Sequence, residues 1–227
     1  MTGRAESATR WMALLFAGGS ACFVVASLPG FVQLAGSAVA GIVYFVGSLQ
    51  FTSAASIQWL VTIRRVNIDW ASSAIQFVGT LLFNLNTYDA LQKGLDANSY
   101  DRLVWTPDLV GSLCFLISSY LAYGVASGGF FARPRRSRDS VIATLNLAGS
   151  IAFGIAAIAS FWVPSSGSIV DLAVANSFTA LGGLCFLVGA ILLFPAERLH
   201  PSRMMISSSW ARSLAACEGF PGSSSSG

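Results

Sequence analysis

The chain has 227 residues, of which 54% are hydrophobic and 10% are charged, and its mean hydropathy is +0.67. A soluble domain carries about 25% charged residues, which it needs to cover its surface. The composition therefore excludes a water-soluble protein and predicts that lipid is the solvent for most of the chain. The net charge is only +3, and no soluble basic domain accompanies the apolar part, so we expect no nucleic-acid partner.

Six apolar segments follow one another along the chain. No residue from Trp11 to Ile63 is charged, which is too long a stretch for one span of about 20 residues. Pro29-Gly30 is typical of a turn and divides this stretch in two. The predicted spans cover residues 11–28, 39–63, 70–88, 107–126, 141–163 and 170–194. They form a six-helix transmembrane domain over residues 11–196, between a short cytoplasmic N-terminus (1–10) and a partly disordered cytoplasmic tail (197–227).

An all-α polytopic membrane fold fits these segments better than the alternatives. A soluble helical bundle needs charged outer stripes on its helices, and none of the six segments has one. Strands fit these segments poorly, because a transmembrane β-barrel needs segments of about ten residues in which hydrophobic and polar residues alternate. A cleaved signal peptide over residues 1–28 is an alternative for the first segment, because Arg4 and Arg10 precede its apolar core.

Each predicted span contains one copy of a short motif: Gly, then Gly, Ser or Thr, then any two residues, then Phe. The six copies begin at Gly19, Gly47, Gly79, Gly111, Gly149 and Gly182. Residues four apart share a helix face, and small residues let helices approach closely in a bilayer. We therefore interpret the motif as an internal repeat for helix packing, in which Gly forms a hollow and Phe fills a hollow on a neighbour. Lining of a substrate path is the alternative. The copy in the first segment favours a span over a signal peptide.

Basic residues predict the orientation, since Lys and Arg favour the cytoplasmic side. With both termini in the cytoplasm, Lys93 and Arg102 are the only basic residues outside. Consecutive spans then pair as three helical hairpins in the cytoplasmic membrane. Trp11, Trp59 and Trp70 fall near the inner interface, as an aromatic belt requires. The basic stretch 133–138 is expected to touch anionic lipid headgroups.

Three stretches of the chain resemble a known family. They are "FVGSLQFTSAASIQ", "IQFVGTLLFNLNTYDAL" and "LVWTPDLVGSLCFLISSYLAY". They are similar to a multi-span bacterial, mainly actinobacterial, branch of the YrhK-like membrane proteins. The resemblance covers about residues 10–195 and is sharpest over 76–119. It implies a multi-helix membrane protein of unestablished biochemical role, and it supplies no catalytic residue.

Signatures of enzymes are absent from the sequence. There is no HExxH, no P-loop and no GxGxxG that opens a nucleotide-binding fold. The only histidine, His200, follows the last span, so no Ser-His pair or histidine metal site is available inside the membrane. The four cysteines have no CxxC spacing. We predict no enzymatic activity, no cofactor and no metal site.

Polar residues gather at the outer ends of the third and fourth spans. Asn84, Asn86 and Asp89 end the third span, and Asp108 begins the fourth. Because antiparallel spans joined by one loop pack together, we expect these four side chains to converge in a shallow outer pocket. The two carboxylates disfavour an anion there, so the pocket suits a cation or a polar neutral solute.

Helix capping is the alternative explanation for the outer acidic residues. Thr106 has the position of an N-cap, with Pro107 first in the helix and Asp108 in its first turn. Ser168 is placed as the cap of the sixth span, with Asp171 in the first turn of that helix.

Two functions remain open at this level. The favoured one is a structural or interaction module, either a homo-oligomer or a scaffold for a membrane-protein partner, since packing motifs dominate and no charge lies in mid-membrane. The alternative is a small-solute or cation channel or transporter with an outer-facing polar site. Transporters usually place ionisable groups and broken helices near the midplane, and neither is found here.

Overall fold

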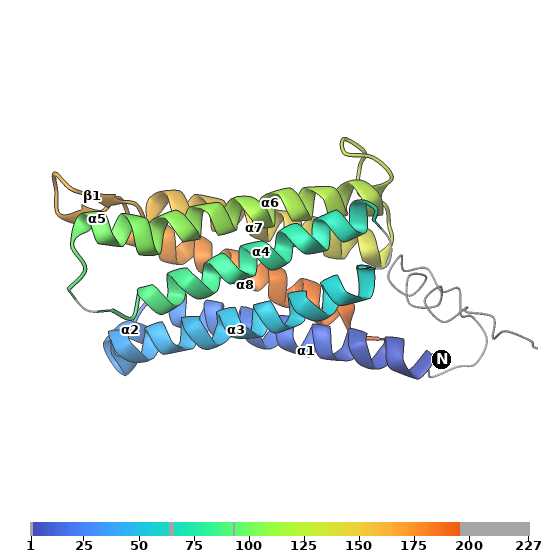
Figure 1. Cartoon of the computed structure of the whole chain (residues 1–227), viewed down its shortest axis with the longest axis horizontal. Coiled ribbons are helices and arrows are strands. Elements are labelled where there is room, and N and C mark those ends of the chain that lie inside the picture. The colour runs from blue at the N-terminus through green and yellow to red at the C-terminus, as the bar shows by residue number, and fades with distance from the viewer. Residues whose placement is uncertain (1, 64–65, 93, 196–227) are drawn as a thin grey trace, which may run out of the picture.

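The computed structural model describes residues 2–63, 66–92 and 94–195. Six long helices run along one common axis (Figure 1). They are α1 (Thr2–Ser27), α3 (Ser37–Thr62), α4 (Ile68–Asp89), α6 (Thr106–Ser127), α7 (Arg138–Ala159) and α8 (Leu172–Leu193). The N-terminus and the end of α8 lie at the same end of the bundle (Figure 1).

Five helical segments are long and apolar enough to cross a membrane. They are Gly3–Ser27, Ser37–Thr62, Ala97–Ser127, Arg138–Ala159 and Leu172–Leu193. The chain is therefore an all-helical protein with the composition of a multi-pass membrane protein. Helix α4 is not among the five, although its 22 residues match the length of α6, α7 and α8.

The long helices form a closed ring. Each packs against two neighbours, in the order α1, α3, α4, α6, α7, α8 and back to α1. Five of these six contacts join helices that follow one another along the chain. The sixth joins α1 to α8 and closes the ring between the two ends of the described chain.

The phenylalanines of the six motifs meet inside the ring. Each has at most 7% of its surface exposed; they are Phe23, Phe51, Phe83, Phe115, Phe153 and Phe186. Contacts between rings cross from one side to the other, with centroids 6.0 Å apart for Phe51 and Phe115 and 5.8 Å apart for Phe23 and Phe153. Aromatic pairs at such separations each contribute about 0.5–1.5 kcal/mol beyond their area burial. We call these six side chains the Phe cluster.

The ends of several helices differ from the predicted spans. The fifth span was expected to reach residue 163, but α7 ends at Ala159 and a two-stranded hairpin follows, β1 (Trp162–Val163) with β2 (Ser168–Ile169). The turn after α1 leads into a short helix that was not expected, α2 (Phe31–Ala35). Glycines at both its ends have positive φ, 89° at Gly30 and 87° at Gly36, which only glycine adopts readily.

The predicted tail, residues 197–227, lies outside the described residues. Helix α1 begins at Thr2, so residues 2–10 of the predicted N-terminal segment are helical and continue into the first span.

Candidate functional site

Three positions of the motif point to three different places in the ring. Successive helical residues are rotated by about 100°, so the motif's fifth residue lies about 40° from its first and about 60° from its second. The Phe therefore lies between the Gly on one side and the second residue on the other. In a closed ring this directs the Phe inward and turns its two companions toward the two neighbouring helices.

The motif glycines lie where α1 meets α3, α4 meets α6 and α7 meets α8. A Cβ on Gly79 would lie 2.9 Å from the ring of Phe115 and 3.1 Å from the carbonyl oxygen of Gly111. A Cβ on Gly111 would lie 3.0 Å from the ring of Phe83 and 3.2 Å from the carbonyl oxygen of Gly79. Each glycine thus faces the motif of its partner helix, and there is no room for a side chain.

The same reciprocal arrangement occurs in the other two pairs. Gly19 and Gly47 face each other between α1 and α3, with Phe51 beside Gly19 and Phe23 beside Gly47. Gly149 lies beside Phe186, and Gly182 lies beside Phe153 and the carbonyl oxygen of Gly149. All six motif glycines therefore lie in contacts between helices of the same chain.

The second motif position lies at the contacts between these pairs. Between α6 and α7, Ser112 donates to the carbonyl oxygen of Phe153 at 3.4 Å, and Ser150 donates to that of Phe115 at 3.2 Å. Between α3 and α4, the hydroxyls of Ser48 and Thr87 are hydrogen-bonded at 2.9 Å. A Gly occupies this position in α8, where a Cβ on Gly183 would lie 3.2 Å from the carbonyl oxygen of Ser20 on α1.

Helix α4 is held by polar side chains on both of its contact faces. The hydroxyls of Ser73 and Thr62 are 2.7 Å apart at the contact with α3, and those of Ser72 and Ser118 are 3.2 Å apart at the contact with α6. These groups lower the hydropathy of α4 but are satisfied inside the ring.

The four residues of the predicted outer pocket are not brought together. Asn84 donates from Nδ2 to Oγ1 of Thr52 on α3 at 2.9 Å, and Asp89 accepts from Gln92 at 2.7 Å. Asn86 instead lies beside Asp108. The reason is helical periodicity: Asn84 and Asn86 are two residues apart and so point to nearly opposite sides of α4. The predicted four-residue site is therefore corrected to the pair Asn86 and Asp108.

Asp108 has partners that the sequence analysis did not identify. Ser160, just beyond the last turn of α7, donates to Oδ2 of Asp108 at 3.4 Å. The hydroxyls of Tyr44 on α3 and of Tyr100 in α5 (Ala97–Tyr100) lie within electrostatic range of Asp108. Tyr44 is in turn hydrogen-bonded to Ser27 of α1 at 2.7 Å. Within the described chain, no ion pair involves Asp108.

A spacing of seven residues links these polar groups to the motif. Asp108 precedes Phe115 by seven residues, Tyr44 precedes Phe51 by seven, and Ser160 follows Phe153 by seven. Seven residues are nearly two helical turns, so each group lies above its Phe on the inward face. A search of the sequence for polar residues seven positions from a motif Phe would have identified Tyr44 and Ser160.

Capping does not account for Asp108. Helix α6 continues back through a π-helical turn, η1 (Asp101–Trp105), into α5, so Thr106 is not an N-cap. Thr106 instead donates its hydroxyl to the carbonyl oxygen of Asp101 at 2.6 Å. The wider turn accommodates Pro107, which has no N–H to continue the α-helical bonding.

Asp171 provides the contrast. It is itself the N-cap of α8 and accepts from the backbone N–H of Val174 at 2.9 Å, whereas Ser168 lies in β2. The predicted cap was therefore three residues too early. Capping explains the carboxylate of Asp171 and leaves that of Asp108 unexplained.

No cluster of three or more His, Cys, Asp or Glu side chains suited to a metal ion occurs among residues 2–63, 66–92 and 94–195. Comparisons of the chain with protein-family models, curated proteins and solved structures found no match.

Proposed function

We propose that the chain is a six-span protein of the cytoplasmic membrane whose ring carries an outward-facing polar site for a small cation or a polar neutral solute. In this proposal both termini are cytoplasmic, the three adjacent helix pairs are repeated hairpins, and the chain performs no enzymatic step. Its membership of the YrhK-like family stays a prediction.

The sixth span of this proposal is α4. Its 22 residues extend about 33 Å, enough for a hydrocarbon core of about 30 Å. Its polar groups bond to α3 and α6, while the side chains that it exposes at mid-length are Val78, Leu81 and Leu85. Helix α4 thus turns its polar side chains toward α3 and α6 and its apolar side chains outward, as expected of a helix that crosses the bilayer between them.

The observation that carries the proposed function is the environment of Asp108. An ionisable residue inside a helical membrane bundle marks a binding site by default. Here one carboxylate meets only neutral oxygen and nitrogen groups, from Asn86 and Ser160, and no basic partner within the described residues. A single negative charge with neutral donors suits a monovalent cation better than a divalent one, which needs several carboxylates.

The Phe cluster limits what such a site does in this conformation. It lies about two turns below Asp108 and fills the middle of the ring, so a ligand at Asp108 does not pass through it. This geometry supports binding from the outer side over open conduction.

A structural or interaction module is the second candidate function. The same closed ring favours it, because the Phe cluster fills the middle of the bundle. The motif glycines do not support self-association, however, because each of the six already packs against another helix of the same chain. A partner would have to use the outer, lipid-facing surface.

A thermal-stability screen in lipid nanodiscs tests the first function. Sodium, potassium and a panel of neutral polar solutes are added in turn, with choline chloride as the ionic-strength control. We expect a ligand to raise the unfolding temperature of the wild type and of Asp171→Asn, which keeps the α8 cap, but not of Asp108→Asn. A shift that survives in Asp108→Asn, or no shift with any ligand, contradicts the proposed site and leaves the second candidate.

A further inference from the structure

The loop between α6 and α7, residues 128–137, projects from the end of the bundle where the basic residues gather and is hydrogen-bonded to both helices. Gly128 ends α6 with φ 80°, and the N–H of Gly129 donates to the carbonyl oxygen of Gly124 at 2.9 Å. Tyr123 donates to the carbonyl oxygen of Ala132 at 2.6 Å, and the N–H of Arg135 donates to Ser140 at 2.9 Å. The loop is therefore held in one shape by both helices that it joins.

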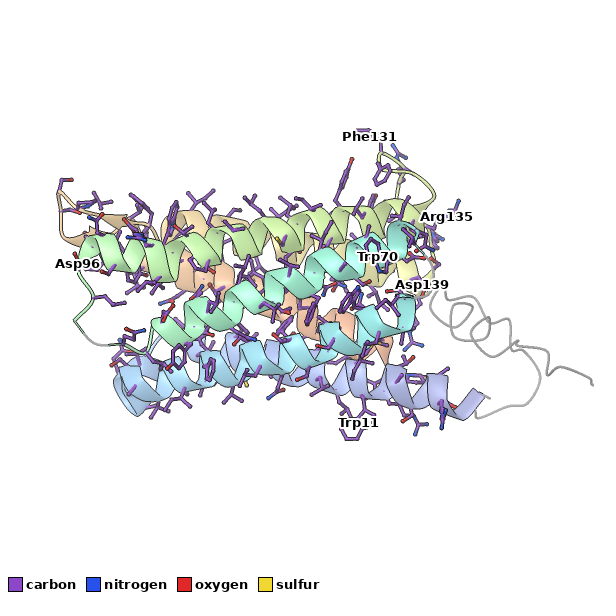
Figure 2. All side chains as sticks on the ribbon, viewed as in Figure 1. Trp11, Trp70, Asp96, Phe131, Arg135 and Asp139 are labelled. Carbon is purple, nitrogen blue, oxygen red and sulfur yellow. The ribbon has the colours of Figure 1, made fainter. Side chains whose placement is uncertain are left out.

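Two adjacent phenylalanines in this loop have different environments. Phe130 packs over Gly124 and lies 5.3 Å, centroid to centroid, from Tyr120 of α6. Phe131 is 98% exposed. In Figure 2 it projects sideways from the bundle, away from the helices. A fully exposed aromatic side chain on an ordered loop has no role in the packing of this chain.

The position of Phe131 along the bundle matches that of two tryptophans. Figure 2 shows Trp11 and Trp70 at about the same level on the long axis, with Arg135 nearer the end. Trp11 is 58% exposed on the outside of the ring. Aromatic side chains at one level mark a membrane–water interface, and the headgroups begin just beyond it. The level of Phe131 is therefore the one expected of a membrane–water interface.

The four arginines of this region divide into two kinds. Arg138 donates to the carbonyl oxygen of Phe194, and the guanidinium of Arg135 lies over Gly128 at the C-terminal end of α6, where a positive charge is favourable. Arg133 and Arg136 are exposed, and neither has a hydrogen bond or ion pair within the described part of the chain. Two guanidinium groups of the loop that carries Phe131 therefore have no partner among residues 2–63, 66–92 and 94–195.

We propose that Phe131, Arg133 and Arg136 form a binding site for an anionic phospholipid of the adjacent leaflet. Phe131 inserts beside the acyl chains, and the two guanidinium groups bind the phosphate and the charged headgroup. Arginine suits this role because its planar fork binds phosphate oxygens with two parallel hydrogen bonds. The site is separate from Asp108, and the proposal does not depend on the function assigned there.

The test compares nanodiscs of phosphatidylcholine alone with nanodiscs containing one quarter phosphatidylglycerol. We expect phosphatidylglycerol to raise the unfolding temperature of the wild type by several degrees, and Arg133→Ala with Arg136→Ala to lose most of this increment. The control is Arg4→Ala with Arg10→Ala, which removes the same charge from the same end and should keep the increment. Phe131→Ala should reduce it, and Phe131→Leu should keep it.

Three outcomes would overturn the proposal. The first is an absent phosphatidylglycerol effect in the wild type. The second is an equal loss in the two double variants, which would indicate general attraction between charges. The third is full reproduction of the effect by inorganic phosphate on detergent-solubilised protein, which would indicate a phosphate site without lipid insertion. The unfolding temperature in phosphatidylcholine alone should stay unchanged in the Arg133 and Arg136 variant, since a drop there would show that these side chains have protein partners. Each double variant is therefore compared with its own value in phosphatidylcholine, because Arg10 forms an ion pair with Glu6.

Discussion

The hydroxyl of Ser160 donates to Oδ2 of Asp108 at 3.4 Å across 52 residues of sequence. This contact joins the end of α7 to the early part of α6, two helices that are neighbours in the ring but have opposite directions (Figure 1). It places the hydroxyl of Ser160, which also donates to the carbonyl oxygen of Ala157 at 2.9 Å, beside the carboxylate of Asp108.

Ser160→Ala is expected to weaken ligand-dependent stabilisation less than Asp108→Asn does. The first variant removes a neutral hydroxyl and leaves the negative charge in place, whereas the second removes the charge. A titration of unfolding temperature against ligand concentration in nanodiscs measures both midpoints. Ser166→Ala, which removes an exposed hydroxyl in the β1–β2 turn, is the matched control. A Ser160→Ala midpoint equal to the wild type would remove this residue from the site.

Replacing Gly79 or Gly111 by Leu should destabilise the protein by about 1–3 kcal/mol, the usual cost of an overpacked contact. A Cβ alone would already come within 3.2 Å of the neighbouring helix. Leu is at least as apolar as Gly, so impaired membrane insertion would not explain a loss. Unfolding in mixed detergent measures the change. Gly154 on α7 provides the control, because a Cβ there meets nothing within 4 Å. Equal effects at Gly154 and Gly79 would contradict the packing role.

Phe115→Ala should cost about 3–5 kcal/mol, as for other large-to-small changes at filled sites. The side chain is fully buried and contacts the rings of Phe51, Phe83 and Phe186. Leu113→Ala on the same helix is the control, because Leu113 is 48% exposed on the outer surface and should cost much less. The same unfolding assay applies. A cost below that of Leu113→Ala would show that the Phe cluster is not what holds the ring together.

The proposed topology predicts which single cysteines a membrane-impermeant reagent labels in whole cells. In a variant without the four native cysteines, Asn98→Cys in α5 should react and Pro134→Cys in the α6–α7 loop should not. Both positions are exposed, so a difference reports the side of the membrane and not burial. Pro134 is preferable to Ser137, whose side chain caps α7. Labelling at position 134 alone would invert the orientation, and labelling at both positions would contradict the single span, α6, that the topology places between them.

Local features of the sequence determined the class of this protein and much of its helix packing. Apolar segments of about 20 residues predict helices in lipid because no other backbone structure satisfies its hydrogen bonds there except a closed barrel. The spacing of Gly and Phe predicts a shared face because helical periodicity is a local property. Gly79 and Gly111 could therefore be assigned to close contacts before any neighbour was known.

The tertiary structure alone decided which helices became neighbours. Closure of the ring by α1 and α8 depends on the summed packing of all six helices. Gly183 lies at this contact, but a glycine in α8 does not by itself identify α1 as the neighbouring helix. The tertiary structure also decided the surroundings of Asp108. In the sequence, its position directly after Pro107 is also explained by a place in the first turn of a capped helix. In the structure, η1 precedes α6, so Asp108 is not in the first turn of a helix, and Ser160 at the end of α7 lies beside it. Asn84 turned the other way, toward Thr52, because two residues along a helix reverse the direction of a side chain, and only the ring shows what lies on each side.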